Sequence, residues 1–148
     1  MTASPRVVLG MAAYNRPDAL PRTLESLLSQ TYRDFALVIV DDGASPDVAA
    51  IVDTYAKGDP RVSYEANATR LGMVGNWRKV FERARERHPR SEYFAWVSDH
   101  DVWHARWLEE MVAVLEARPE VVLAYPQNLR MMPDDARATD KRFDTVGI

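Results

Sequence analysis

The sequence contains no cysteine in its 148 residues, which excludes disulfides and thiolate metal sites and fits a reducing compartment. It also lacks an apolar run near the ~20 residues that a membrane-spanning helix requires, so we expect no transmembrane segment. The short apolar stretch at residues 7–14 is followed at once by charge and proline, and we interpret it as a strand rather than a secretory signal. We therefore expect a cytoplasmic protein, for which peripheral contact with a membrane would still be compatible.

An excess of positive charge is missing as well. Lysine and arginine total 19 against 22 aspartates and glutamates, and the formal net charge is -3. Because a general basic field is what drives non-specific binding to nucleic acid, we expect no nucleic-acid partner. With 47% hydrophobic and 28% charged residues the composition is that of an ordinary globular protein, and the length favours one domain.

What the sequence does have is a regular alternation of apolar runs with segments of helical periodicity. Five runs are predicted strands, and they lie at residues 7–13, 35–40, 61–64, 93–97 and 121–125. Apolar residues at helical spacing fall between them, with Asp18 and Ser45 as predicted N-caps of the first two helices. The pattern predicts an α/β fold with a mostly parallel sheet and helices on both faces. Residues 1–126 form the predicted domain, and 127–148 read as a polar tail, either a loop or the start of a further part.

Three clusters of polar residues each follow a predicted strand directly. Tyr14-Asn15-Arg16 comes after the first strand, Asp41-Asp42 after the second, and Asp99-His100-Asp101 after the fourth. In an open parallel sheet the carboxyl ends of the strands share one rim, where ligands bind. We therefore expect the three clusters to meet in one pocket.

The acidic residues 99–101 suggest a cation, because crowded carboxylates repel one another unless an ion neutralises them. Oxygen ligands favour Mg²⁺ or Mn²⁺, and an imidazole ligand would favour Mn²⁺. In the alternative interpretation, Asp99 caps a helix starting near His104 and its neighbours are solvated.

The other clusters have two interpretations each. One of Asp41 and Asp42 can stabilise the turn before Gly43, while the other accepts a hydrogen bond from a nucleobase or ribose. Tyr14 can stack on a base or cover the end of the sheet. Arg70, which precedes a predicted helix, can bind a diphosphate or be an ordinary exposed arginine.

Three segments together resemble the opening of family-two glycosyltransferases with the GT-A fold. They are "VVLGMAAYNRPDALPRTLESLLSQTYRDFALVIVDDGAS", "RLGMVGNWRKVFERA" and "EYFAWVSDHDVWHARWLEEM", and the similarity runs from about residue 7 to residue 126. The resemblance implies a Rossmann-like three-layer sandwich, the donor-binding half of a GT-A enzyme. It also implies transfer from a nucleotide sugar, usually a UDP-sugar, to a glycan or lipid-linked acceptor with inversion and a divalent metal, Mn²⁺ or Mg²⁺.

The resemblance also implies roles for individual residues. The residues expected to bind the nucleotide sugar are Ala12, Ala13, Tyr14, Asn15, Asp41, Asp42 and Arg70, with Arg70 near the diphosphate. The residues expected to bind the metal are Asp99, His100 and Asp101.

The sequence departs from the family pattern in three places. The metal motif is often D-x-D-D, and here the two spaced aspartates correspond either to Ser98 and His100 or to Asp99 and Asp101. "DDGA" replaces the usual "DDGS". The chain ends before the acceptor-binding half that carries the general base of the family, so no base is named. A second hypothesis is therefore a catalytically inactive module that binds nucleotide sugars or a partner, and turnover would distinguish the two.

Overall fold

The computed structural model describes residues 4–126, 130–131 and 138–139. The chain divides into two compact units, Met1–Arg106 and Trp107–Ile148, which we describe separately. In the first unit the strands are β1 (Val7–Ala13), β2 (Phe35–Asp41), β3 (Val62–Ala66) and β4 (Tyr93–Val97). Its helices are α1 (Leu20–Leu28), α2 (Pro46–Ala56) and α3 (Gly72–Arg87).

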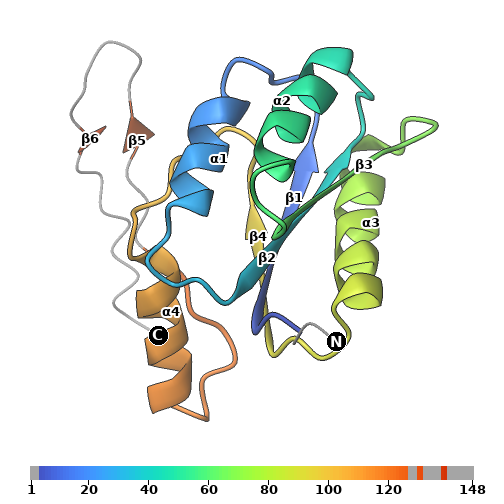
Figure 1. Cartoon of the computed structure of the whole chain (residues 1–148). Coiled ribbons are helices and arrows are strands. Elements are labelled where there is room, and N and C mark those ends of the chain that lie inside the picture. The colour runs from blue at the N-terminus through green and yellow to red at the C-terminus, as the bar shows by residue number, and fades with distance from the viewer. Residues whose placement is uncertain (1–3, 127–129, 132–137, 140–148) are drawn as a thin grey trace. The chain divides into compact units, whose positions relative to one another are not determined.

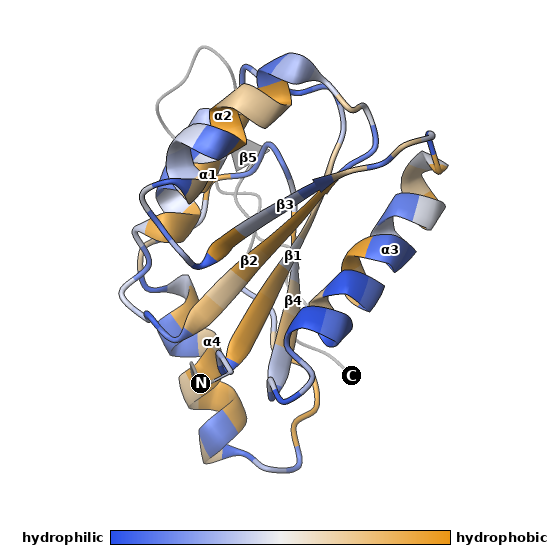
Figure 2. Ribbon diagram, turned by 45° about the vertical axis from the view of Figure 1, so that its right-hand side comes forward, coloured by the Kyte–Doolittle hydropathy of each residue, from blue (hydrophilic) through white to orange (hydrophobic). Residues whose placement is uncertain are grey.

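The strands form one parallel sheet in the order β3-β2-β1-β4. Helices α1 and α2 cover one face of it and α3 covers the other (Figure 1, Figure 2). This confirms the predicted α/β class with a parallel sheet and helices on both faces. The chain moves from β1 outward to β3 and then returns to the other side of β1 with β4, so the strand order reverses between β1 and β4.

The central position of β1 and β2 follows from their apolar runs. Leu9, Leu37 and Ile39 are completely buried, as a strand covered on both faces requires. Val8 and Val38 pack with Ala84 of α3, and because side chains alternate along a strand, Leu9 and Leu37 point to the face that carries α1 and α2.

Gly10 lies on the α3 face of β1, where there is room for hydrogen only. A Cβ at this position would lie 2.6 Å from atoms of both Phe94 and Val80. The glycine therefore lets α3 approach the middle of the sheet closely.

The apolar stripe of α3 is only partly buried. Val80 and Ala84 lie in the core, whereas Trp77 and Phe81 are 42% and 41% exposed. Both aromatic rings contact β4: Trp77 lies 4.6 Å from Trp96 and Phe81 lies 5.1 Å from Phe94, measured between ring centroids.

The predicted N-caps are corrected by the structure. Asp18 is not the cap of α1, whose N-cap is Ala19 without a side-chain hydrogen bond. A backbone turn precedes the helix instead, in which the Leu20 N–H donates to the Arg16 carbonyl. Because proline has no N–H, the proline in the first turn also removes one donor that would otherwise need a capping acceptor. Ser45 does occupy the N-cap position of α2, but its side chain makes no capping bond.

The second unit contains α4 (Trp107–Ala117) and a short antiparallel pair, β5 (Arg130–Met131) with β6 (Ala138–Thr139). The predicted fourth helix is confirmed, but the predicted strand at residues 121–125 is wrong, because this segment has no regular structure. Val122 and Leu123 are 95% and 72% exposed, so the run is not covered on both faces as a buried parallel strand would be.

The boundary between the compact units falls after Arg106, and the predicted domain of residues 1–126 stays a prediction. The predicted tail, residues 127–148, lies outside the described residues except for the two short strands. Among the helices that the structure describes, none is both long enough and apolar enough to span a bilayer.

Candidate functional site

The candidate site lies where the loops leave the carboxyl ends of β1, β2 and β4. Ala13 pairs with Asp41 across β1 and β2, and Met11 pairs with Val97 across β1 and β4, so the three strands end at the same edge. This edge includes the point between β1 and β4 where the strand order reverses, which is where α/β proteins bind ligands. The topology thus agrees with the expectation that the three polar clusters share one rim.

Asp99 joins the β4 loop to the β1 loop. Its carboxylate accepts a hydrogen bond from the Tyr14 N–H at 2.9 Å and lies 2.8 Å from the His100 Nδ1, with the Arg16 Nε at 3.9 Å. The carboxylate is only 8% exposed, so these contacts compensate its burial. Asp99 therefore fixes two loops against each other and does not cap a helix near His104.

The rest of this loop faces solvent. His100 and Asp101 are exposed, and the Asp101 N–H donates to the Ser98 Oγ at 3.0 Å. Within the described residues no three side chains of the metal-binding types form a ready-made cluster. The loop therefore fits an ion such as Mg²⁺ or Mn²⁺ only as a partial site, in which bound phosphate oxygens or water complete the coordination.

Asp41 performs the turn chemistry expected of one member of the Asp41-Asp42 pair. It is fully buried, and its carboxylate accepts hydrogen bonds from the Gly43 N–H at 2.8 Å, the Ser45 N–H at 3.2 Å and the Tyr64 hydroxyl at 3.0 Å. Burial, together with the bond to this carboxylate, raises the pKa of Tyr64. Asp41 thus supports the β2 loop from below and has no exposed surface for a ligand.

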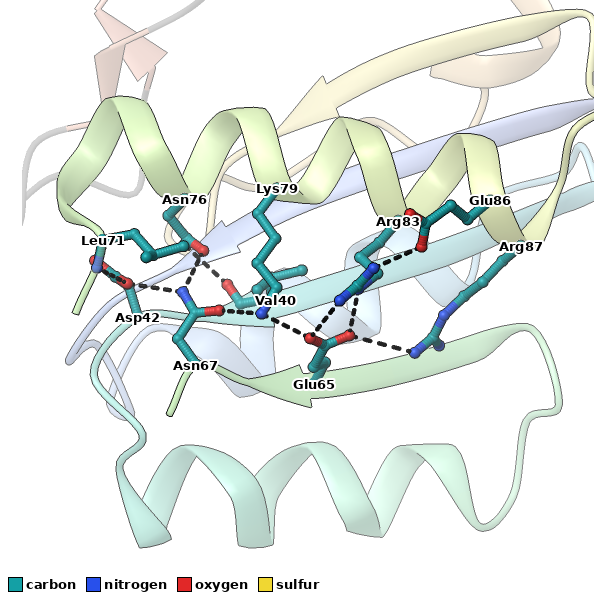
Figure 3. Close-up of polar contacts among 10 residues, drawn as sticks. All are labelled: Val40, Asp42, Glu65, Asn67, Leu71, Asn76, Lys79, Arg83, Glu86 and Arg87. Atoms are coloured by element: carbon teal, nitrogen blue, oxygen red, sulfur yellow. Dashed lines mark hydrogen bonds and ion pairs between the residues drawn. The ribbon is translucent and has the colours of Figure 1, made fainter. Parts of the chain in front are cut away.

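Asp42 caps α3 from a distance. Its carboxylate accepts hydrogen bonds from the Asn67 Nδ2 at 2.7 Å, the Leu71 N–H at 2.7 Å and the Gly72 N–H at 2.8 Å (Figure 3). Leu71, the N-cap residue of α3, provides no capping side chain, so Asp42 takes that role. Burial acts to raise the pKa of Asp42, but these hydrogen bonds and the nearby Arg70 together hold that pKa below its usual value.

Arg70 and Tyr14 meet above the rim. The guanidinium carbon of Arg70 lies 4.5 Å from the centroid of the Tyr14 ring, which is a cation–π distance. Both side chains are exposed, although they come from loops 56 positions apart in the sequence, and Tyr14 in turn is tied to Asp99 through its backbone. A flat aromatic ring, a guanidinium and a carboxylate are therefore gathered in one place.

Asn15 links the β1 loop to the β2 loop. It has a left-handed backbone, with φ of 49°, and a Cβ at position 43 would lie 2.3 Å from its Oδ1. Only glycine at position 43 leaves space for this side chain. Ala12 and Ala13 end β1 directly below, and the Ala13 carbonyl accepts a hydrogen bond from the Asp42 N–H at 2.9 Å.

The sequence interpretation missed the residues that hold Asp42. The Asn67 Nδ2 donates to the Asn76 Oδ1 at 3.0 Å as well as to Asp42, and the Asn76 Nδ2 donates to the Val40 carbonyl at 3.0 Å. Lys79 Nζ donates to the Asn67 Oδ1 at 2.8 Å. The sequence did contain signals for both asparagines. Asn76 stands four residues before Val80 and eight before Ala84, which places it on the buried face of α3. Asn67 directly follows β3, at the same edge of the sheet as the other polar clusters.

The chain is similar to known proteins over most of its length. The model of the glycosyl transferase family 2 matches residues 9–142. The putative glycosyltransferase EpsH of Bacillus subtilis (strain 168) is 34% identical over 125 residues, which are 81% of this chain and 33% of that protein. The chain spans 28%, 40% and 33% of the length of three curated relatives, so it is similar to a part of each.

Two solved structures share the fold. The mannosyltransferase PcManGT from Pyrobaculum calidifontis, in complex with GDP-Man and Mn²⁺, matches with a TM-score of 0.66 and 22% identity over 81% of this chain and 34% of that one. TarS 1–349 of S. aureus, in complex with UDP, matches with a TM-score of 0.65 and 21% identity over 76% of this chain and 32% of that one. At these identities the likeness concerns the GT-A fold.

Proposed function

Because the chain belongs to glycosyl transferase family 2, we propose that the rim formed by the β1, β2 and β4 loops binds the donor of a glycosyl transfer reaction, a UDP-sugar. The observation that carries the proposal is the meeting of Tyr14, Arg70 and Asp99, from three separate loops, at the reversal of strand order. Two proteins of the same fold were solved with UDP or GDP-Man, which supports a nucleoside diphosphate as the ligand class.

The nucleoside would lie between the β1 and β2 loops. Tyr14 offers an exposed ring on which a base can stack. Asp42 keeps capacity for a ligand, because a carboxylate offers about four acceptor positions and three are used by the protein. A base N–H or a ribose hydroxyl would take the fourth. Ala12 and Asn15 would form the floor of this part, and the buried Ala13 and Asp41 would support it without touching the ligand.

Arg70 would bind the diphosphate. Its guanidinium is always charged and offers donors that match phosphate oxygens. The cation–π contact with Tyr14 orients the side chain before a ligand arrives. Binding the base and the diphosphate by neighbouring groups explains why both residues sit above the same rim.

Asp99, Asp101 and His100 would hold a divalent ion, Mn²⁺ or Mg²⁺, together with the phosphates of the donor. When bound, the ion acts as a Lewis acid on the departing diphosphate. Asp99 would remain hydrogen-bonded to Tyr14 and so would keep the ion in register with the base.

The proposed reaction is transfer with inversion to a glycan or lipid-linked acceptor, by a protein that acts in the cytoplasm and is compatible with peripheral contact with a membrane. A second candidate function is a donor-binding module without turnover. It predicts the same binding of a nucleotide sugar, and only turnover distinguishes it from the transferase.

Calorimetric titration with UDP and with GDP, each with and without Mn²⁺, tests the donor site. We expect UDP to bind with micromolar to millimolar affinity and to bind more tightly with the ion. If neither nucleotide binds at millimolar concentration, the proposed function is wrong. If UDP does bind, release of free sugar from UDP-sugars by this chain would exclude the inactive module.

A further inference from the structure

The segment that carries Arg70 is anchored to Asp42 at both of its ends. Asn67 at the start of the segment donates from its side chain to Asp42, and Leu71 and Gly72 at the end donate from their backbone. The residues between, Ala68 to Arg70, are exposed. The position of Arg70 is therefore determined by what holds the two ends.

Asn67 is the side chain on which the first anchor depends. It is 4% exposed, and each polar group of its amide has a partner: both N–H groups donate, to Asp42 and Asn76, and its oxygen accepts from Lys79. Its backbone N–H also donates to the Asp41 carbonyl at 2.9 Å. A buried amide with every group paired has one low-energy orientation, because turning it would leave donors facing donors.

The partners of Asn67 are themselves fixed. Asn76 is 2% exposed and donates to the Val40 carbonyl on β2. Lys79 forms an ion pair at 2.7 Å with Glu65, and Glu65 is held from the other side by Arg83 at 2.8 Å (Figure 3). The chain of contacts thus runs from β2, β3 and α3 through Asn67 to Asp42, and ends at the segment of Arg70.

We propose that Asn67 is a positioning residue for the diphosphate of the donor. It acts through Asp42 and the 68–70 segment, and it keeps the Arg70 guanidinium over Tyr14 so that the phosphates meet a charge that is already oriented. Without the Asn67 side chain the segment keeps the backbone bond to the Asp41 carbonyl but loses its tie to Asp42 at this end, and binding must order the released residues. This inference rests on the proposed donor site.

The test compares UDP with uridine, because only UDP carries the diphosphate. We expect Arg70→Ala to lower the UDP-to-uridine affinity ratio about tenfold, the size of one lost charged hydrogen bond. Asn67→Ala lowers the same ratio by a similar factor. In the double variant Asn67→Ala/Arg70→Ala the ratio falls no further than in Arg70→Ala alone, since the first change acts through the second residue.

The inference is overturned if Asn67→Ala leaves the ratio unchanged, lowers both affinities equally, or adds its full effect to that of Arg70→Ala. Ser63→Ala is the matched control: it removes a half-buried hydrogen bond that Ser63 on β3 donates to the Leu37 carbonyl on β2, away from the 67–72 segment, and it should leave the ratio unchanged. Unfolding midpoints of all variants are measured alongside. Asn67→Ser, which is too short to reach Asp42, replaces Asn67→Ala if that variant does not fold.

Failure of the donor site and failure of this inference give different results. If the unaltered chain binds neither UDP nor GDP, the proposed function fails. If it binds UDP normally and Asn67→Ala keeps the UDP-to-uridine ratio, only the role of Asn67 fails. Should GDP bind better than UDP, the pair to compare is GDP with guanosine.

Discussion

The two sides of the rim are built in opposite ways. On the β2 and α3 side, the carboxylate of Asp42 lies in a buried network whose amides are fully paired. On the β4 side, one carboxylate is held by the protein, while His100 and Asp101 face solvent. We call the first the closed side, because the protein alone holds it, and the second the open side, because its side chains face solvent. In the proposed donor pocket, the closed side would be the preorganised half and the open side the half that is assembled on binding.

The largest expected effect comes from removing the centre of the closed side. Asp42→Leu leaves three donors without their acceptor, two of them at the start of α3, and we expect a loss of about 3 kcal/mol in the free energy of unfolding. Urea unfolding followed by circular dichroism measures it. A loss below about 1 kcal/mol would mean that the network contributes little and that the contrast between the two sides is misplaced.

Acid should weaken the closed side through protonation of Asp42. The pKa of Asp42 lies below its ordinary value of 3.8, so its contribution to stability is present above that value and is lost as the pH falls through the lower folded pKa. Asp42→Asn lacks this titration, and we expect its free energy of unfolding to fall less between pH 5 and pH 3, as urea unfolding at each pH would measure. Glu65, whose pKa is lowered by Arg83 and Lys79, titrates in both proteins. Equal slopes for the two proteins would contradict the prediction.

A methyl group at Gly43 should separate stability from binding. It would meet the Asn15 Oδ1, a flexible side-chain end, so Gly43→Ala should cost only about 1 kcal/mol while moving Asn15. We expect UDP affinity to fall several-fold, measured by titration. The matched change Gly58→Ala, where the nearest atom is 3.8 Å away, should leave UDP affinity unchanged. Unchanged affinity in Gly43→Ala would remove Asn15 from the donor site.

The smallest effect on stability is expected on the open side. Asp101→Ala removes an exposed carboxylate and should change the free energy of unfolding by less than about 0.5 kcal/mol. The same variant should lose most of the gain in UDP affinity that Mn²⁺ produces. If Mn²⁺ strengthens UDP binding equally in the variant and the unaltered chain, Asp101 does not belong to the ion site.

The scaffold of the site could be predicted from sequence because its signals are local. The apolar runs that became β1, β2 and β4, and the polar residues directly after them, were enough to bring Tyr14, Asp42 and Asp99 to one rim. The same kind of signal failed at residues 121–125, because an apolar run becomes a strand only where a sheet and a covering layer receive it.

The internal connections of the site could not be predicted, because they join residues that are distant in sequence. Asn67 looks like ordinary turn chemistry until Asp42, 25 positions earlier, and Asn76 are seen on either side of it. The division of work between Asp41 and Asp42 likewise depends on which carboxylate faces the start of α3. The roles in donor binding came from resemblance to a family, and they remain predictions.

Helix α3 is pinned at two points along its length. Asp42 accepts a hydrogen bond from Gly72 in its first turn. In its middle, Val80 packs closely against β1, because Gly10 has no side chain there. These two contacts resist sliding and tilting of α3. If this side of the rim binds the proposed donor, we expect adjustment to the ligand to fall on the exposed residues 68–70 rather than on the helix.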